Sequence, residues 1–314
     1  MTVEQVKGAL YGVAIGDALG VPAEFKTREF MEENPVTDFE GFKIHNQPPG
    51  TFSDDASLTF CLAESLCTGY DLLDMADRFV RWQTKGYWGA HGKVFDIGNT
   101  TYRAISRLKR GVQPELAGDF EEENNGNGSL MRILPLVFYT KDLDLEARYD
   151  VVKDVSSMTH GHIRAVIACF YYLEFALLLL SGKDKFEAYE KAAKNVNQLL
   201  RKKAVNEKEI ALYDPILADD INSYPPQRIR SSGYVVDTLL ASVWSFISTE
   251  NYSEATLKAV NLGYDTDTAG AVTGGIAGLY YGVNGIPEKW KREIARSEDI
   301  DELGLRLFNM RSLQ

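Results

Sequence analysis

Two series of glycines, each repeating every fourth residue, limit how this 314-residue chain can fold more than any other feature. They are Gly8, Gly12, Gly16 and Gly20 near one end, and Gly270, Gly274, Gly278 and Gly282 near the other. An interior glycine destabilises a helix by about 1 kcal/mol relative to alanine, so eight of them need a structural reason. This spacing puts them on one helix face, where missing side chains allow close backbone approach. We therefore expect two tightly crossing helices, and our hypothesis is that they cross each other.

Helical periodicity dominates the rest of the chain. Apolar positions recur at intervals of three and four residues, which is typical of helices, and no regular strand–helix alternation is found. The predicted helices span residues 3–19, 58–68, 72–84, 99–108, 130–139, 143–157, 163–180, 185–201, 207–218, 234–247, 253–261 and 267–281. The best strand candidates are short pieces between Val36 and Ile44. The pattern predicts an all-α chain with one domain over residues 1–314.

Composition excludes several classes of function. Apolar residues make up 45% of the chain and charged residues 25%, which are ordinary globular values. The net charge of −11 argues against nucleic acid as a bulk electrostatic partner. The most apolar stretch, Ala165–Leu180, contains Glu174 and is short for a membrane span, so we interpret it as a buried helix. Without a signal-peptide pattern at the N-terminus, we expect a cytoplasmic protein, and we expect a monomer.

Two acidic clusters lie far apart in the sequence. One is Ser53-Asp54-Asp55, and the other is Asp265-Thr266-Asp267-Thr268. Carboxylate and hydroxyl oxygens are hard ligands that suit Mg²⁺ or Mn²⁺. Each cluster precedes a predicted helix, so each could simply be a helix cap. Taken together, and with Glu24 added, they favour a metal site, one that we expect to hold two ions.

Asp96 is a second kind of acidic signal. It lies between apolar residues in Phe95–Gly98, just before a predicted helix. It is either an acid of an ordinary turn or a pocket acid used for proton transfer. The residues alone leave both interpretations open.

A glycine-rich turn formed by Gly126, Asn127, Gly128 and Ser129 precedes the predicted helix at 130–139. Backbone N–H groups in such turns bind anions such as phosphate. The turn matches no standard nucleotide-binding fingerprint, and an ordinary loop is the alternative.

Two further side chains have a functional and a structural interpretation. His160 follows Thr159 and either hydrogen-bonds a substrate or plays a structural role. Tyr234 precedes an apolar helix and either stacks on a base or is an ordinary core tyrosine.

In this order and spacing, the motifs resemble the ADP-ribosylglycohydrolase family, which includes dinitrogenase reductase-activating glycohydrolase and the ADP-ribosyl-arginine hydrolases. The resemblance extends from Gly12 to Gly282. Its markers are Gly16–Gly20 through Glu24, Ser53–Asp55, Phe95–Gly98, Gly126–Arg132, Thr159-His160 and Asp265–Gly270. The resemblance implies an all-α fold around two Mg²⁺ or Mn²⁺ ions. By matching motifs, it implies as metal ligands Ser53, Asp54, Asp55, Asp265, Asp267 and Thr268.

The resemblance also implies roles toward an ADP-ribosyl substrate. Glu24 would position the substrate or its attacking water, and Asp96 would lie by the scissile ribose. The turn at 126–129 would hold the diphosphate, His160 would contact the distal ribose or the phosphates, and Tyr234 would flank adenine. The implied activity is removal of ADP-ribose from a protein side chain, with arginine as the first expectation.

Alternatives stay open at this point. Serine-linked ADP-ribose or O-acetyl-ADP-ribose could be the substrate, the protein could bind ADP-ribose without cleaving it, and a purely structural helical protein would use the acidic clusters as caps. Two residues depart from the family pattern. Ala56, followed by Ser57, stands where threonine is usual, and Tyr264 stands where a small or acidic residue is common. Neither departure removes an implied ligand.

Overall fold

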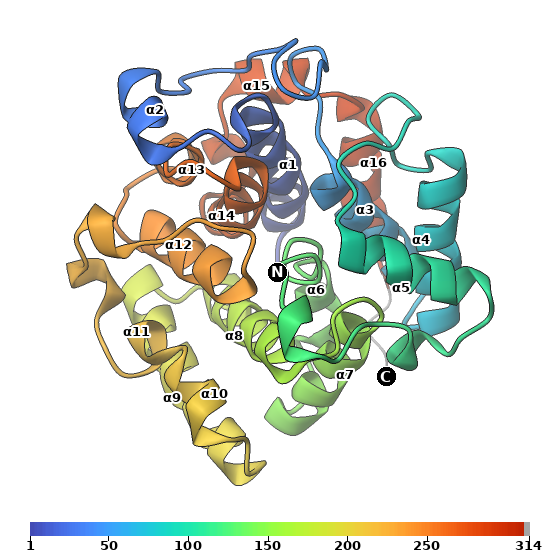
Figure 1. Ribbon diagram of the computed structural model, residues 1–314, viewed down its shortest axis with the longest axis vertical. Coiled ribbons are helices and arrows are strands. Elements are labelled where there is room, and N and C mark those ends of the chain that lie inside the picture. The colour runs from blue at the N-terminus through green and yellow to red at the C-terminus, as the bar shows by residue number, and fades with distance from the viewer. Residues whose placement is uncertain (311–314) are drawn as a thin grey trace.

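The computed structural model describes residues 1–310, and all regular structure within that range is helical. The described residues form sixteen α-helices, of which two, α1 and α14, make a central crossing pair that the others surround (Figure 1). They are α1 (Val3–Gly20), α2 (Arg28–Glu33), α3 (Asp54–Leu66), α4 (Leu72–Lys85), α5 (Asn99–Lys109), α6 (Leu136–Thr140), α7 (Leu145–Ser157), α8 (Ile163–Leu180), α9 (Lys185–Lys202), α10 (Glu207–Ala211), α11 (Asp214–Leu217), α12 (Val235–Ile247), α13 (Tyr252–Val260), α14 (Thr266–Tyr281), α15 (Glu288–Glu293) and α16 (Ser297–Phe308).

The glycine hypothesis is confirmed, because the two glycine series face each other in the contact between α1 and α14. A Cβ atom built on Gly12 would lie 2.1 Å from the carbonyl oxygen of Gly274, and one built on Gly274 would lie 2.2 Å from that of Gly12. Backbone therefore packs directly on backbone. At the far end of the contact, a Cβ on Gly20 would lie 2.3 Å from the Cα atom of Asp267.

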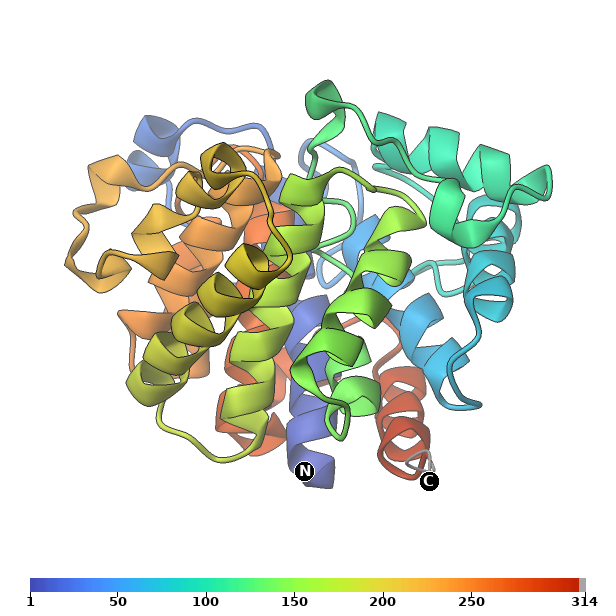
Figure 2. The same ribbon diagram turned by 90° about the horizontal axis from the view of Figure 1, so that it is seen from below.

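Other helices enclose this pair. Helices α3 and α16 pack against α1, whereas α8, α12 and α13 pack against α14. Helix α8 has the length and apolar character of a membrane span, with a mean hydropathy of 2.0, but 83% of it is buried inside the protein. Figure 2 shows that α1 begins and α16 ends at the same edge of the molecule.

The strands expected between Val36 and Ile44 are wrong, because this segment is a loop. The side-chain amide of Asn261 satisfies the backbone of Val36, accepting from its N–H at 2.8 Å and donating to its carbonyl at 2.9 Å. Further along, the N–H of Phe42 donates to the carbonyl of Gln47 and closes a turn. The loop thus satisfies these backbone groups without a neighbouring strand.

Two predicted helices are also wrong in part, each because of a proline. The helix expected at 130–139 begins only at Leu136, after Pro135, since proline disfavours helical geometry in the residue before it. The helix expected at 207–218 is divided into α10 and α11, and Pro215 lies in the first turn of the second piece. Helix α3 begins four residues earlier than the predicted 58–68, directly at the first acidic cluster.

We expect Gly274→Ala to destabilise the protein by about 3 kcal/mol or to prevent folding, because the new methyl group would collide with backbone that cannot rotate away. Urea denaturation measures the free energy of unfolding. Gly98→Ala is the matched control, since its Cβ would meet only Thr101 Oγ1, at 4.0 Å. Equal stability of the two variants would contradict the tight contact.

Candidate functional site

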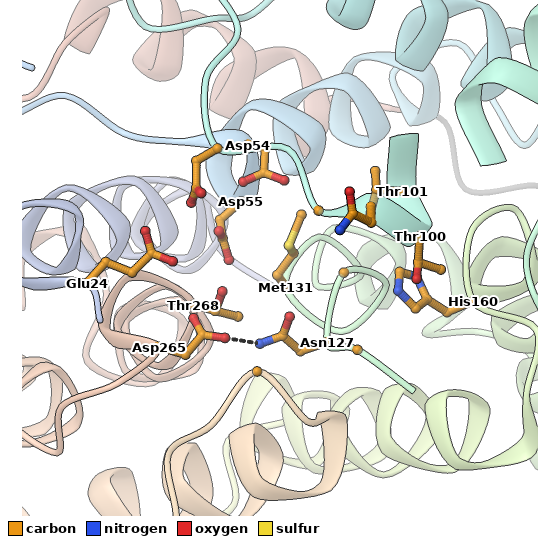
Figure 3. A pocket seen from close by; sticks show the side chains of 16 residues that line it. Glu24, Asp54, Asp55, Thr100, Thr101, Asn127, Met131, His160, Asp265 and Thr268 are labelled. Carbon is orange, nitrogen blue, oxygen red and sulfur yellow. Dashed lines mark hydrogen bonds between the residues drawn. The ribbon is translucent and has the colours of Figure 1, made fainter. Parts of the chain in front are cut away.

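The two acidic clusters meet at one cavity of about 250 Å³. Figure 3 shows carboxylates from distant parts of the chain turned toward it. Of the residues expected to act together, those lining the cavity are Glu24, Asp54, Asp55, Asp96, Gly126, Asn127, Gly128, His160, Asp265 and Thr268. The fold thus brings together residues separated by more than two hundred positions.

The end of α1 and the start of α14 place Glu24 beside the second acidic cluster. Besides the contact at Gly20, the Thr266 hydroxyl donates to the Gly20 carbonyl at 2.7 Å. The backbone after Glu24 then pairs with the backbone before Asp265, where the N–H of Phe25 donates to the Tyr264 carbonyl at 2.7 Å. Oxygens of Glu24, Asp265 and Asp267 consequently lie within 4.8 Å of one another.

Asp17 holds the first acidic cluster in place. Its buried carboxylate accepts the N–H of Ser53 at 2.8 Å and the N–H of Ala56 at 2.9 Å. These groups belong to the first turn of α3, which has no partners for them within the helix. Asp17 therefore caps α3 from α1 and fixes the direction of Asp54 and Asp55.

Burial and mutual repulsion shape the electrostatics of the site. Burial raises the pKa of Asp54, Asp55 and Asp267 well above the usual range, and the neighbouring carboxylates raise it further. Burial likewise raises the pKa of Asp17 and of Glu24 to about 7. So many carboxylates cannot all be ionised in one place without a compensating cation.

Two buried carboxylate oxygens point to such a cation. Asp55 Oδ1 and Asp267 Oδ2 have no hydrogen-bond partner within the described residues. Buried charged groups are normally paired or coordinate a metal ion. Oxygen donors at this density fit a hard divalent cation, and they do not fit zinc or copper, which prefer nitrogen and sulfur.

The other end of the cavity carries the glycine-rich turn and His160. Asn127 Nδ2 donates to Asp265 Oδ2 at 2.8 Å, which links the turn to the acidic end (Figure 3). A Cβ on Gly128 would lie 2.7 Å from Cε1 of His160, so only glycine fits there. The expectation that the turn opens a helix is wrong, since turns continue until α6 begins at Leu136.

Four expected site residues do not line the cavity. Ser53 and Asp267 are buried behind it, where Ser53 Oγ donates to Asp55 Oδ2 at 3.1 Å. The Ser129 hydroxyl faces the core and accepts a hydrogen bond from Ser156 at 3.0 Å. Tyr234 lines a neighbouring cavity instead, together with Tyr264.

Several residues of the site were missed from the sequence. Asp17 belongs to the Gly16–Gly20 motif, but its capping role depends on the start of a helix 36 residues away. His45 lies in the loop after α2, where its Nε2 contacts Glu24 Oε2. Thr100 and Thr101, in the first turn of α5, also line the cavity, as do Gly98, Asn99, Met131 and Gly233. None of them stands in a sequence pattern that indicates this placement.

The two departures from the family pattern leave the cavity intact. Ala56 is buried, and its backbone N–H donates to Asp17, a hydrogen bond that threonine at this position could also make. Tyr264 has a left-handed backbone with φ of 64°, and the residue is half-exposed and lines the neighbouring cavity, not the acidic one.

Comparisons with known proteins agree on one family. A family profile described as ADP-ribosylglycohydrolase matches residues 2–314. The ADP-ribosylarginine hydrolase Tri1 of Pseudomonas putida (strain GB-1) is 33% identical over 310 residues, covering 98% of this chain and 78% of that protein. The ADP-ribosyl-dinitrogen reductase glycohydrolase of Rhodospirillum rubrum is 28% identical, covering 94% and 95%. A solved ADP-ribosylglycohydrolase-related protein complex is similar with a TM-score of 0.81 at 31% identity, covering 98% of each chain.

We expect Asp17→Ala to reduce the free energy of unfolding by about 1–3 kcal/mol, because it leaves buried N–H groups of α3 without an acceptor. It should also weaken Mg²⁺ binding measured by calorimetry, since Asp54 and Asp55 lose their fixed direction. Asp144→Ala is the control. Asp144 caps the remote helix α7, so that variant should lose stability but retain Mg²⁺ affinity. Unchanged Mg²⁺ affinity in Asp17→Ala would contradict the positioning role.

We expect the melting temperature of the protein in EDTA to fall as the pH rises toward 7. The folded state holds the protons of Asp17 and Glu24 up to about pH 7, whereas the unfolded chain releases them near 3.8 and 4.5. Folding therefore takes up protons in this window, and stability declines as the pH rises through it. Thermal melts at several pH values test this. Excess Mg²⁺ should flatten the profile, and an identical decline with Mg²⁺ would show that no cation binds.

Proposed function

The chain belongs to the ADP-ribosylglycohydrolase family, and we propose that it hydrolyses the N-glycosidic bond between ADP-ribose and an arginine side chain of a modified protein. One observation carries this proposal. A single cavity has a cluster of carboxylates at one end and a glycine-rich turn with His160 at the other. Such a cavity can place a ribose among the acids while the turn receives a diphosphate.

The choice of arginine rests on the comparisons. The relative from Pseudomonas putida is an ADP-ribosylarginine hydrolase and matches nearly the whole of this chain. Serine-linked ADP-ribose, O-acetyl-ADP-ribose and binding without cleavage are the alternatives that the experiment below separates.

We infer that the acidic end holds two divalent cations, Mg²⁺ or Mn²⁺. The orphaned oxygens of Asp55 and Asp267 fit this requirement. The residues that would hold the ions are Ser53, Asp54, Asp55, Asp265, Asp267 and Thr268. When bound, such ions align a sugar diol and a water molecule and act as Lewis acids.

The remaining carboxylates suit proton transfer. Hydrolysis adds the oxygen of water to C1″, breaks the bond from C1″ to nitrogen, and delivers a proton to the departing guanidine. Glu24 and Asp96 face the cavity where this exchange would occur. Burial raises the pKa of Glu24 to about 7, which suits proton exchange near neutral pH. The contact between His45 Nε2 and Glu24 Oε2 orients that carboxyl group.

We expect the protein to release ADP-ribose from an arginine-modified peptide with Mg²⁺ or Mn²⁺ but not with EDTA. Asp55→Asn and Asp267→Asn should reduce release to background, because each removes a charge needed for cation binding. Glu24→Gln should reduce kcat by about 10²- to 10⁴-fold while the cations still bind. Chromatography of released ADP-ribose measures each rate.

Matched substrates and a control variant give the alternatives distinct outcomes. If the protein cleaves a serine-modified peptide or O-acetyl-ADP-ribose but not the arginine-modified peptide, arginine is the wrong linkage and the cleaved substrate takes its place. Binding of ADP-ribose without release from any substrate would identify a non-catalytic binder. Asp150→Asn, an exposed carboxylate paired with Lys203 and remote from the cavity, should retain full activity.

A further inference from the structure

Arg132 is fully buried beneath the glycine-rich turn and has no acidic partner within the described residues. Its Nη2 donates to the Val155 carbonyl at 3.1 Å and to Thr159 Oγ1 at 2.7 Å. Its Nε and Nη1 have no hydrogen-bond partner there. Burial lowers the pKa of Arg132 to about 10, so the guanidinium remains charged at neutral pH. The guanidinium also lies over the ring of Phe79, 4.9 Å from its centroid, but it forms no ion pair within the described residues, so this buried cation needs a reason.

The hydroxyl of Thr159 connects this cation to His160. Thr159 Oγ1 lies 2.9 Å from His160 Nδ1. Arginine can only donate, so the hydroxyl must accept from Arg132. Its single hydrogen then has one acceptor within the described residues, which is Nδ1 of His160. If Nδ1 carried a proton instead, the buried hydroxyl hydrogen would have no acceptor, which is unfavourable.

We propose that Arg132, acting through Thr159, fixes His160 in the tautomer that carries its proton on Nε2, so that the ring donates a hydrogen bond to the diphosphate of ADP-ribose. Arg132 and Thr159 are positioning residues in this arrangement, and only His160 touches the ligand. The identification of the diphosphate as the acceptor of this hydrogen bond rests on the proposed function, whereas the tautomer of His160 does not.

The position of the ring supports this direction of donation. His160 lines the cavity, and its Nε2 faces the glycine-rich turn, where a Cβ on Gly126 would lie 3.5 Å away. The backbone on both sides of His160 is held in place, because the N–H of Asp119 donates to the Thr159 carbonyl at 3.2 Å and that of Gly161 donates to the Asp119 carbonyl at 2.8 Å. Nε2 is thus the ring nitrogen available to a ligand.

The protonation state of the ring agrees with the geometry. Burial lowers the pKa of His160 to about 3, and the charge of Arg132 lowers it further in the same direction. A neutral imidazole has a single N–H group, so which nitrogen carries it decides whether the cavity receives a donor or an acceptor. A diphosphate offers only acceptors, and an Nε2 lone pair would repel it.

Nitrogen NMR of ¹⁵N-histidine-labelled protein tests the tautomer directly, because the chain contains only four histidines. His160→Gln removes one set of signals and so assigns them. We expect His160 Nδ1 to resonate as an unprotonated nitrogen and Nε2 as a protonated one. Thr159→Val should shift both signals toward a tautomer mixture, whereas Thr159→Ser, which keeps the hydroxyl, should preserve the wild-type pattern. A proton on Nδ1 in the wild type would overturn the proposal.

Calorimetry with ADP-ribose and Mg²⁺ tests whether the diphosphate accepts a hydrogen bond from His160. Thr159→Val should weaken binding by about tenfold, the effect of losing one hydrogen bond to a charged group. His160→Ala should weaken it similarly, whereas His160→Gln should bind close to wild type, because its amide restores a donor. If Thr159→Val does not fold, the wild-type spectrum and the two His160 variants still decide. Equal affinity of His160→Ala and wild type for ADP-ribose would contradict the hydrogen bond from His160 to the diphosphate.

The two failures are distinguishable. A wild-type protein that shows the Nε2 proton but binds no ADP-ribose would overturn the proposed function and the diphosphate as recipient. A wild-type protein that binds ADP-ribose but carries the His160 proton on Nδ1 would leave the proposed function standing and overturn the proposed role of Arg132 and Thr159.

Discussion

The direct packing of α1 backbone on α14 backbone is the constraint on which the site depends. Side chains at this contact would push the helices apart, and glycine is the only residue that leaves room. The contact ends at Gly20, against the Cα atom of Asp267, so it also sets the position of Glu24 relative to the second acidic cluster. The glycines lower helix propensity, and burial of a close-packed helix pair offsets that loss.

A second contact transmits this geometry to the first cluster. Asp17 extends from the same helix α1 to the backbone of Ser53 and Ala56, so one helix orients both sets of carboxylates. Burial and then the neighbouring carboxylates raise the pKa of Asp54 and of Asp267, so gathering these groups is electrostatically unfavourable. A fold that keeps such a cluster buried gives up stability in exchange for cation affinity, which is the expected compromise at a functional site.

The sequence was sufficient wherever a pattern determines the contact itself. The spacing of Gly12 and Gly274 predicted the helix crossing, because fourth-residue repeats define a face without knowledge of the rest of the fold. The acidic motifs, the glycine-rich turn and His160 together predicted ten residues of the cavity lining. Sequence patterns failed to predict local structure and contacts that depend on a residue far away in the chain. Asn261 keeps Val36 out of a strand, and the cap formed by Asp17 and the contact of His45 with Glu24 exist only after folding. Local periodicity also could not weigh the effect of Pro135.

Opposite electrostatic character at the two ends of the cavity gives an ADP-ribosyl ligand one direction of entry. The acidic end repels a diphosphate and attracts cations, whereas the other end has the unpaired charge of Arg132 behind the glycine-rich turn. That charge lies behind Thr159 and His160 and forms no ion pair with a carboxylate within the described residues. Through Thr159, the cation fixes which nitrogen of the neutral imidazole carries the proton, and the cavity receives a single N–H donor. The separation therefore preserves both ends for the ligand and for the cations.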